Sequence, residues 1–98
     1  MSKHQLTKDE TFKSLADPSR RRILKMLGEG EMSAGEIAAK FDMTAPSMSH
    51  HFNVLKSAGL IRTRRNGQQI FYSLDTTVVQ DLMTALLDLF QRETRDEA

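Results

Sequence analysis

Apolar residues recur at three- and four-residue spacing in five stretches of the chain, beginning near residues 7, 18, 33, 45 and 76. This spacing is typical of amphipathic helices. Between the fourth and fifth stretches, at residues 60–74, two runs rich in β-branched and aromatic residues flank a turn signal. The pattern predicts one domain, 1–98, that is mainly α with a small β-hairpin, in the order α-α-α-α-β-β-α.

Capping signals support the first three helix starts. Thr7-Lys8-Asp9-Glu10 and Ser33-Ala34-Gly35-Glu36 both have the spacing of a capping box, in which the cap hydroxyl and the later carboxylate bond each other's backbone amides. Asp17-Pro18 combines a good cap residue with proline at the first helical position. Helices are therefore expected from residue 7, from residue 18 and from residue 34.

The fourth helix is predicted between Thr44 and Gly59. Thr44 can cap it, Pro46 lies in the first turn where a missing N–H costs nothing, and Gly59 ends it. Its apolar positions fall on one side, which predicts a buried stripe of Met48, Phe52 and Leu55.

The opposite side of this helix is short, polar and rich in hydrogen-bonding groups. Because a short connection joins it to the preceding helix, the pair over residues 33–58 has the helix-turn-helix pattern. Such side chains suit base edges and phosphates. His51 lies nearer the apolar stripe and is expected to be structural. The candidate recognition residues are Ala45, Pro46, Ser47, Ser49, His50, Asn53 and Lys56.

The turn signal at Asn66-Gly67 predicts a two-residue hairpin turn in which both residues need positive φ. That turn would pair Arg65 with Gln68 and Ile61 with Tyr72, and it would place Arg64 opposite Gln69. A basic-tipped hairpin directly after a helix-turn-helix predicts a winged helix, with the wing at 60–74. The candidate DNA-binding residues of the wing are Arg62, Arg64, Arg65, Asn66, Gly67 and Gln68.

The last helix, expected at 76–93, has an apolar arc wider than one small core needs. The same helix of a second copy is the expected cover, together with the first helix at 6–16. The predicted homodimer interface consists of Phe12, Val79, Leu82, Met83, Leu86, Leu89 and Phe90.

Charge is unevenly distributed in a chain whose formal net charge is only +1. Residues 40–74 have five basic residues and one acidic residue, whereas residues 75–98 have six acidic and two basic residues. A basic middle suggests a surface for a polyanion. There is no cysteine, and the N-terminal residues do not resemble a signal peptide, so a cytoplasmic protein is expected.

The stretches Leu15–Leu24, Ala34–Ala38, Ser47–Leu55 and Gly67–Leu74 together resemble the ArsR family of bacterial winged-helix repressors. Residues Ser73–Asp81 look most like the SdpR-type autorepressors within it. The resemblance implies a homodimer, joined by its first and last helices, that represses transcription by occupying a double-stranded operator. The narrower likeness implies release by a membrane protein that captures the repressor.

Many ArsR members respond to metal ions, and here the sequence departs from the family. A thiolate site on the third helix is impossible without cysteine, and the last helix has no histidine near Val78 or Leu89, where the family's other site has its ligands. The only histidines are His4, His50 and His51. Neither a metal nor another cofactor is expected.

Several alternatives stay open. A metal- or small-molecule-responsive sensor could share the fold, and a winged helix could serve only for protein–protein assembly. An enzyme is not expected, because no nucleophile–base arrangement or phosphate-cradling glycine loop can be assembled from these residues. The basic run Arg20-Arg21-Arg22 could contact phosphates, or it could form ion pairs with Asp17 or Glu36.

Overall fold

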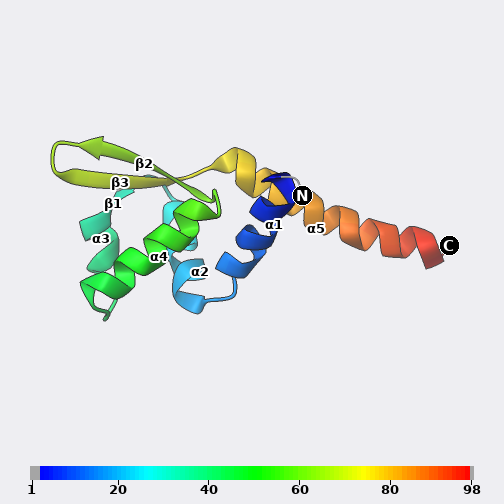
Figure 1. The fold of residues 1–98 in the computed structure, drawn as a ribbon, viewed down its shortest axis with the longest axis horizontal. Helices are drawn as coiled ribbons and strands as arrows, with labels where there is room; N and C mark the ends of the chain where they lie inside the picture. Colours follow the sequence, from blue (N-terminus) through cyan, green and yellow to red (C-terminus); the bar gives the residue numbers. More distant parts are fainter. Residues whose placement is uncertain (1–2, 98) are drawn as a thin grey trace.

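A computed structural model describes the backbone of residues 3–97 and the side chains of residues 9–91. Figure 1 shows a small helical body with a protruding hairpin on one side and a long C-terminal helix on the other. The elements in chain order are α1 (Lys3–Ser14), α2 (Pro18–Leu27), β1 (Met32–Ser33), α3 (Ala34–Ala38), α4 (Ala45–Ser57), β2 (Ile61–Asn66), β3 (Gln69–Leu74) and α5 (Thr76–Glu97).

The predicted mainly helical architecture with a small sheet is confirmed, with one strand added. The sheet has three antiparallel strands in the order β1-β3-β2, because the two-residue β1 pairs with β3. This strand was not predicted, because two residues are too few to show the alternation of apolar and polar positions that indicates a strand. Its partner Tyr72 lies opposite Met32.

The predicted hairpin forms, but its expected register is wrong by two residues. Asn66 pairs with Gln69, so Gly67 and Gln68 occupy the turn, and among the described residues only glycines have positive φ. Gly67 has φ of 66°, which fits a turn with glycine at its first central position. Arg65 therefore lies opposite Ile70. A shift of two residues leaves each side chain on its expected face of the sheet.

The shift has a physical reason in the turn. The observed turn needs positive φ at Gly67 alone, whereas the expected turn would need it at Asn66 as well. In the observed register Ile61 lies opposite Leu74 at the base of the wing, and Tyr72 stacks on Phe52 of α4, with the ring centroids 4.5 Å apart. The buried core comprises Ile23, Leu27, Ile37, Met48, Phe52, Leu55, Ala58, Leu60, Ile61 and Tyr72.

The helix caps of the body agree with the sequence. Asp17 accepts hydrogen bonds from the amides of Ser19 and Arg20, and Ser33 forms a complete capping box with Glu36. The third helix ends at Ala38, and the following turn tightens to i→i+3 hydrogen bonds that extend to Phe41.

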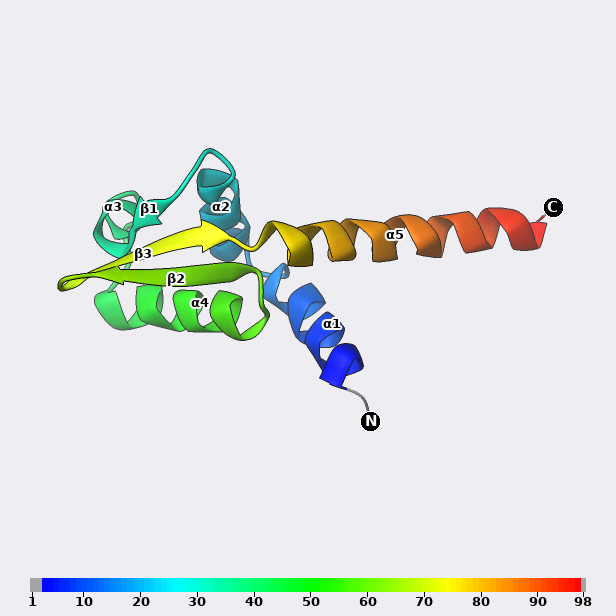
Figure 2. The same ribbon diagram turned by 90° about the horizontal axis from the view of Figure 1, so that it is seen from above.

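The first and last helices differ from expectation at their ends. The backbone is helical from Lys3, so Thr7 lies inside α1 and does not cap it; the preceding lysine, glutamine and leucine are good helix formers and extend the helix. At the other end of the chain, α5 continues to Glu97 and extends away from the body (Figure 2).

Candidate nucleic-acid interface

The N-terminal half of α4 presents an exposed polar face. Thr44 caps the helix by accepting a hydrogen bond from the Ser47 amide at 3.3 Å, and its hydroxyl donates to the Ser47 hydroxyl at 3.0 Å. Met48 points into the core, so the residues around it point outward. All seven candidates on this helix are exposed: Ala45, Pro46, Ser47, Ser49, His50, Asn53 and Lys56.

His51, in contrast, lies at the junction of α4 with α2. Its side chain is only 12% exposed, and its Nδ1 lies 3.3 Å from Nη1 of Arg20 and 3.9 Å from Oδ2 of Asp17. A guanidinium can only donate, so a hydrogen bond across this contact requires the ring tautomer in which Nδ1 accepts. The expectation that His51 is structural agrees with this placement.

Arg20 ties three helices together. Its Nε donates to the Ser14 carbonyl at 2.7 Å, at the C-terminal end of α1, while its Nη1 contacts His51 on α4. Thr11 adds a buried bond from α1 to the end of α4, donating to the Ala58 carbonyl at 2.9 Å. The recognition helix is therefore fixed to both α1 and α2.

The other two arginines of this run also have partners inside the protein. Nη1 of Arg21 donates to the Leu15 carbonyl at 2.7 Å, and the guanidinium of Arg22 lies 4.5 Å from the centroid of the Phe41 ring. Within residues 9–91, neither expected carboxylate partner, Asp17 or Glu36, forms an ion pair with these side chains. Carbonyls and rings take the place of the carboxylates considered from the sequence.

Asp17 combines the cap with local charge. Burial acts to raise the pKa of this carboxyl, but hydrogen bonds from the Arg20 and Ser19 amides and the nearby charges of His51 and Arg20 outweigh it. The pKa of Asp17 therefore lies below its usual value. The start of α2 is stabilised by an ionised cap.

The wing is exposed from Arg62 through Gln69. Along β2, successive side chains alternate between the two faces of the sheet. Arg65 shares its face with Ile61, which packs into the core, whereas Arg62 and Arg64 lie on the other face. The candidate wing residues are thus brought to one hairpin, but they do not share one face.

One wing arginine has a carboxylate partner that sequence reasoning missed. Nη2 of Arg64 donates to Oε1 of Glu31 at 2.7 Å, and its Nε donates to Oε2 at 3.1 Å. The guanidinium also lies over the Phe71 ring, 4.5 Å from its centroid. These partners are far apart in sequence, so only the strand pairing, not a local motif, could have indicated them.

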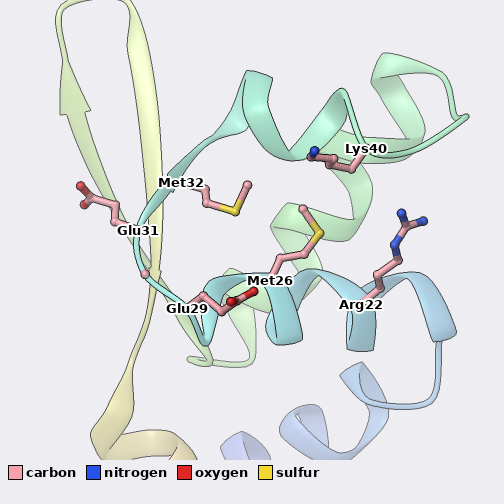
Figure 3. Close-up of a pocket in the computed structure, with 7 residues that line it drawn as sticks. Arg22, Met26, Glu29, Glu31, Met32 and Lys40 are labelled. Carbon is pink, nitrogen blue, oxygen red and sulfur yellow. The ribbon is translucent and has the colours of Figure 1, made fainter.

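A hollow of about 400 Å³ lies between α2, residues 29–32 and Lys40, which follows α3. Figure 3 shows Met26 and Met32 at its centre with Arg22 and Lys40 on one side, while the carboxylate of Glu31 points away from them.

Within the described part of the chain, no group of three metal-ligating side chains comes together. His4 lies outside the residues whose side chains are described. No described helix has both the length and the apolar character needed to span a membrane.

The predicted interface residues of α5 are largely uncovered in the single chain. Met83, Leu89 and Phe90 are 57%, 56% and 62% exposed, and Phe12 on α1 is 41% exposed. Val79 and Leu82 are half-buried because they pack against the core where α5 leaves the body. Leu86 is also exposed.

The chain is similar in sequence to a known domain family and to proteins of known role. A family model described as a helix-turn-helix domain matches residues 15–64, from the end of α1 into β2. The transcriptional repressor SdpR of Bacillus subtilis is 46% identical over 88 residues, covering 90% of this chain and 98% of that protein. The biofilm growth-associated repressor of Agrobacterium fabrum is 41% identical over 81% of this chain and 68% of its own length.

Solved structures agree with the sequence matches. A crystal structure of an ArsR family transcriptional regulator superimposes with a TM-score of 0.82 at 30% identity, over 92% of this chain and 97% of that one. The likeness extends beyond the helix-turn-helix to nearly the whole chain.

Proposed function

The chain belongs to the ArsR family of helix-turn-helix transcriptional regulators, and on this premise we propose that it is a repressor that binds an inverted-repeat operator as a homodimer. Repression follows because the bound protein occupies DNA that the polymerase needs. The relatives named as repressors support the sign of the regulation.

The observation that carries the proposal is the exposed polar face at the start of α4. A recognition helix enters the major groove with its N-terminal residues toward the base edges. The buried stripe of α4 and its ties to Arg20 and Thr11 hold it rigidly, so Ser49 and His50 are presented in a fixed orientation. Lys56 and the exposed wing add cations for phosphates, which supply much of the affinity of such proteins.

Dimerisation through α5, with α1 beside it, explains why a helix with so many apolar side chains extends away from the body (Figure 2). A two-fold axis through these helices would place the two α4 helices on successive major grooves, about 34 Å apart. The expected interface is the set of exposed and half-buried residues on α1 and α5 given above.

Selection of bound duplexes from a random pool tests the proposal. We expect an inverted repeat with half-sites about one DNA turn apart. Ser49→Ala or His50→Ala should change which bases are preferred. Ser57→Ala, at the exposed far end of the same helix, is the matched control and should leave the preference unchanged. Failure to enrich any sequence, with no binding at low salt, would instead favour a role in protein assembly.

A second candidate function is ligand-responsive regulation on the same fold. The hollow beside α2 and β1 favours it, because its volume of about 400 Å³ is within the range of small-molecule sites. Calorimetric titration with zinc and nickel separates a metal sensor from a regulator that responds to neither metal.

A further inference from the structure

The contact between Glu31 and Arg64 crosses the whole sheet. Arg64 on β2 lies opposite Phe71 on β3, and Phe71 in turn lies opposite Ser33 on β1. Glu31 directly precedes β1. The Arg64 side chain therefore passes over the ring of the central strand and ends on a carboxylate beside the far strand.

The geometry is more specific than that of most surface ion pairs. Exposed pairs contribute little to stability as a rule, but here both carboxylate oxygens are engaged, at 2.7 and 3.1 Å. A guanidinium that is both paired in this two-pronged way and stacked on an aromatic ring has few other low-energy orientations. The hydrogen bond between them lowers the pKa of Glu31 and raises the pKa of Arg64, so both groups stay charged.

The Glu31–Arg64 pair determines which wing arginine is available to bind DNA phosphate. A phosphate approaching Arg64 would meet the Glu31 carboxylate beside it, and Arg64 could turn to the phosphate only by giving up two hydrogen bonds and the Phe71 ring. Arg65 is different. It lies on the opposite face of β2, exposed, and within residues 9–91 no ion pair holds its side chain.

We propose that Glu31 is a positioning residue of the DNA-binding surface, which fixes the wing by holding Arg64 across Phe71, and that, of Arg64 and Arg65, it is Arg65 that contacts phosphate. This inference rests on the proposed DNA-binding function and deepens it. Of the two arginines nearest the tip of the wing, Arg64 braces the sheet and Arg65 contacts DNA.

The test is the salt dependence of binding to a duplex that the wild-type protein selects from a random pool. Each lost phosphate contact lowers the slope of log affinity against log salt by about 0.9. We expect Arg65→Gln to lower the slope by about 1.8 for a dimer, since each protomer loses one contact. Arg64→Gln and Glu31→Gln should leave the slope unchanged and weaken binding by roughly the same factor, about 3- to 10-fold, because both release the same brace.

Two further variants distinguish a structural role of Arg64 from a purely electrostatic one. Arg64→Lys keeps the positive charge but loses the two-pronged geometry, so it should behave like Arg64→Gln. The double variant Glu31→Gln, Arg64→Gln should bind no more weakly than either single variant. The matched control is Glu29→Gln, which removes a carboxylate two residues from Glu31 and should bind like wild type.

The opposite pattern would overturn the inference. If Glu31→Gln tightens binding and steepens the salt slope, Glu31 competes with DNA for Arg64. If Arg64→Gln lowers the slope as much as Arg65→Gln, or Arg64→Lys binds like wild type, then Arg64 contacts phosphate itself. Thermal unfolding of each variant shows that it is folded, and Arg64→Lys decides the question if Arg64→Gln does not fold. Lack of binding by the wild-type protein would contradict the proposed function instead.

Discussion

Amphipathic helices occur both in the body of the molecule (residues 3–74) and in the α5 arm (Thr76–Glu97), but the burial of their apolar side chains differs. In the body, the apolar stripe of α4 is covered by the chain itself, and Leu55 is 0% exposed. In the arm, Leu87 and Phe90 are 60% and 62% exposed, and the helix reaches away from the body to give the molecule a length of 54 Å against a width of 26 Å.

The difference separates the contacts that the single chain provides from those that the proposed second copy would provide. The body has a buried core and capped helices, and it carries the polar face of α4 and the wing. The arm has an apolar face whose side chains between Met83 and Phe90 are largely exposed within the described part of the chain. Stability and DNA contact should therefore depend on the body, and assembly should depend on the arm.

The largest effect on the free energy of unfolding is expected from truncating a buried side chain in the core of the body. Leu55→Ala removes a fully buried side chain between α4 and the sheet, so the free energy of unfolding should fall by about 2–5 kcal/mol. Leu87→Ala on the arm is the matched control and should cost far less, because that side chain is 60% exposed. Urea unfolding of both variants measures the difference. Equal losses would mean that the arm is part of the same core.

Breaking the arm should change assembly and leave the body folded. Met83→Glu with Leu86→Glu places charges on the apolar face of α5, and burying such charges unpaired should weaken the dimer by about 3 kcal/mol or more, roughly 100-fold in Kd. Sedimentation should then give a monomer of 11.1 kDa. The circular dichroism spectrum of the body should persist.

The control for this variant adds the same charges to the polar face of the same helix. Gln80→Glu with Thr84→Glu should leave the dimer intact, because both positions are exposed and neither belongs to the predicted interface. A dimer that survives the first pair of changes, or one that is lost equally with the second, would place the interface elsewhere.

The body was also the part that the sequence predicted best, because its signals are local. The cap at Asp17 and the capping box at Ser33 each depend on residues three or fewer positions apart, and both form as expected. The face of α4 follows from helical spacing alone. For these features the physical cause and the sequence signal lie in the same short segment.

Apart from the start of α1, where the helix extends past the expected cap at Thr7, and the hairpin register, which follows from the turn, the errors arose where distant segments decide the outcome. The strand β1 exists only because β3 pairs with it. The Arg64 contact with Glu31 joins residues 33 positions apart. A periodicity or a turn signal contains no information about such pairs, so the role of Arg64 could not be separated from that of Arg65 in advance.

A smaller effect is expected at the tip of the wing, where the body meets solvent. Gly67 has φ of 66°, and a Cβ there would meet nothing within 4 Å, so only the backbone conformation opposes a side chain. Gly67→Val should lower stability by about 1–2 kcal/mol. Gly67→Asn, which tolerates this conformation, should lose clearly less in the same thermal unfolding measurement. Similar losses would argue against the observed turn.

The smallest effect, and the finest test of the body, concerns the charge of the Asp17 cap. The folded pKa of this carboxyl is lowered, so its charge contributes stability above the unfolded value of about 3.9, and this contribution is lost as the pH falls through the folded pKa. Asn caps helices as well as Asp does, so Asp17→Asn keeps the cap and removes only the charge. At pH 7 the variant should be less stable by under about 1 kcal/mol, the usual worth of an anion at a helix start.

The pH dependence is what identifies the cause. The stability gap between the wild-type protein and Asp17→Asn should be present at pH 7 and should shrink as the pH is lowered below about 4, because the wild-type carboxyl then becomes neutral as well. Urea unfolding across this range measures the gap, and the carboxyl of Glu36, present in both proteins, cancels in the comparison. A gap of the same size at pH 3 would mean that Asp17 acts through its hydrogen bonds to the Ser19 and Arg20 amides and not through its charge.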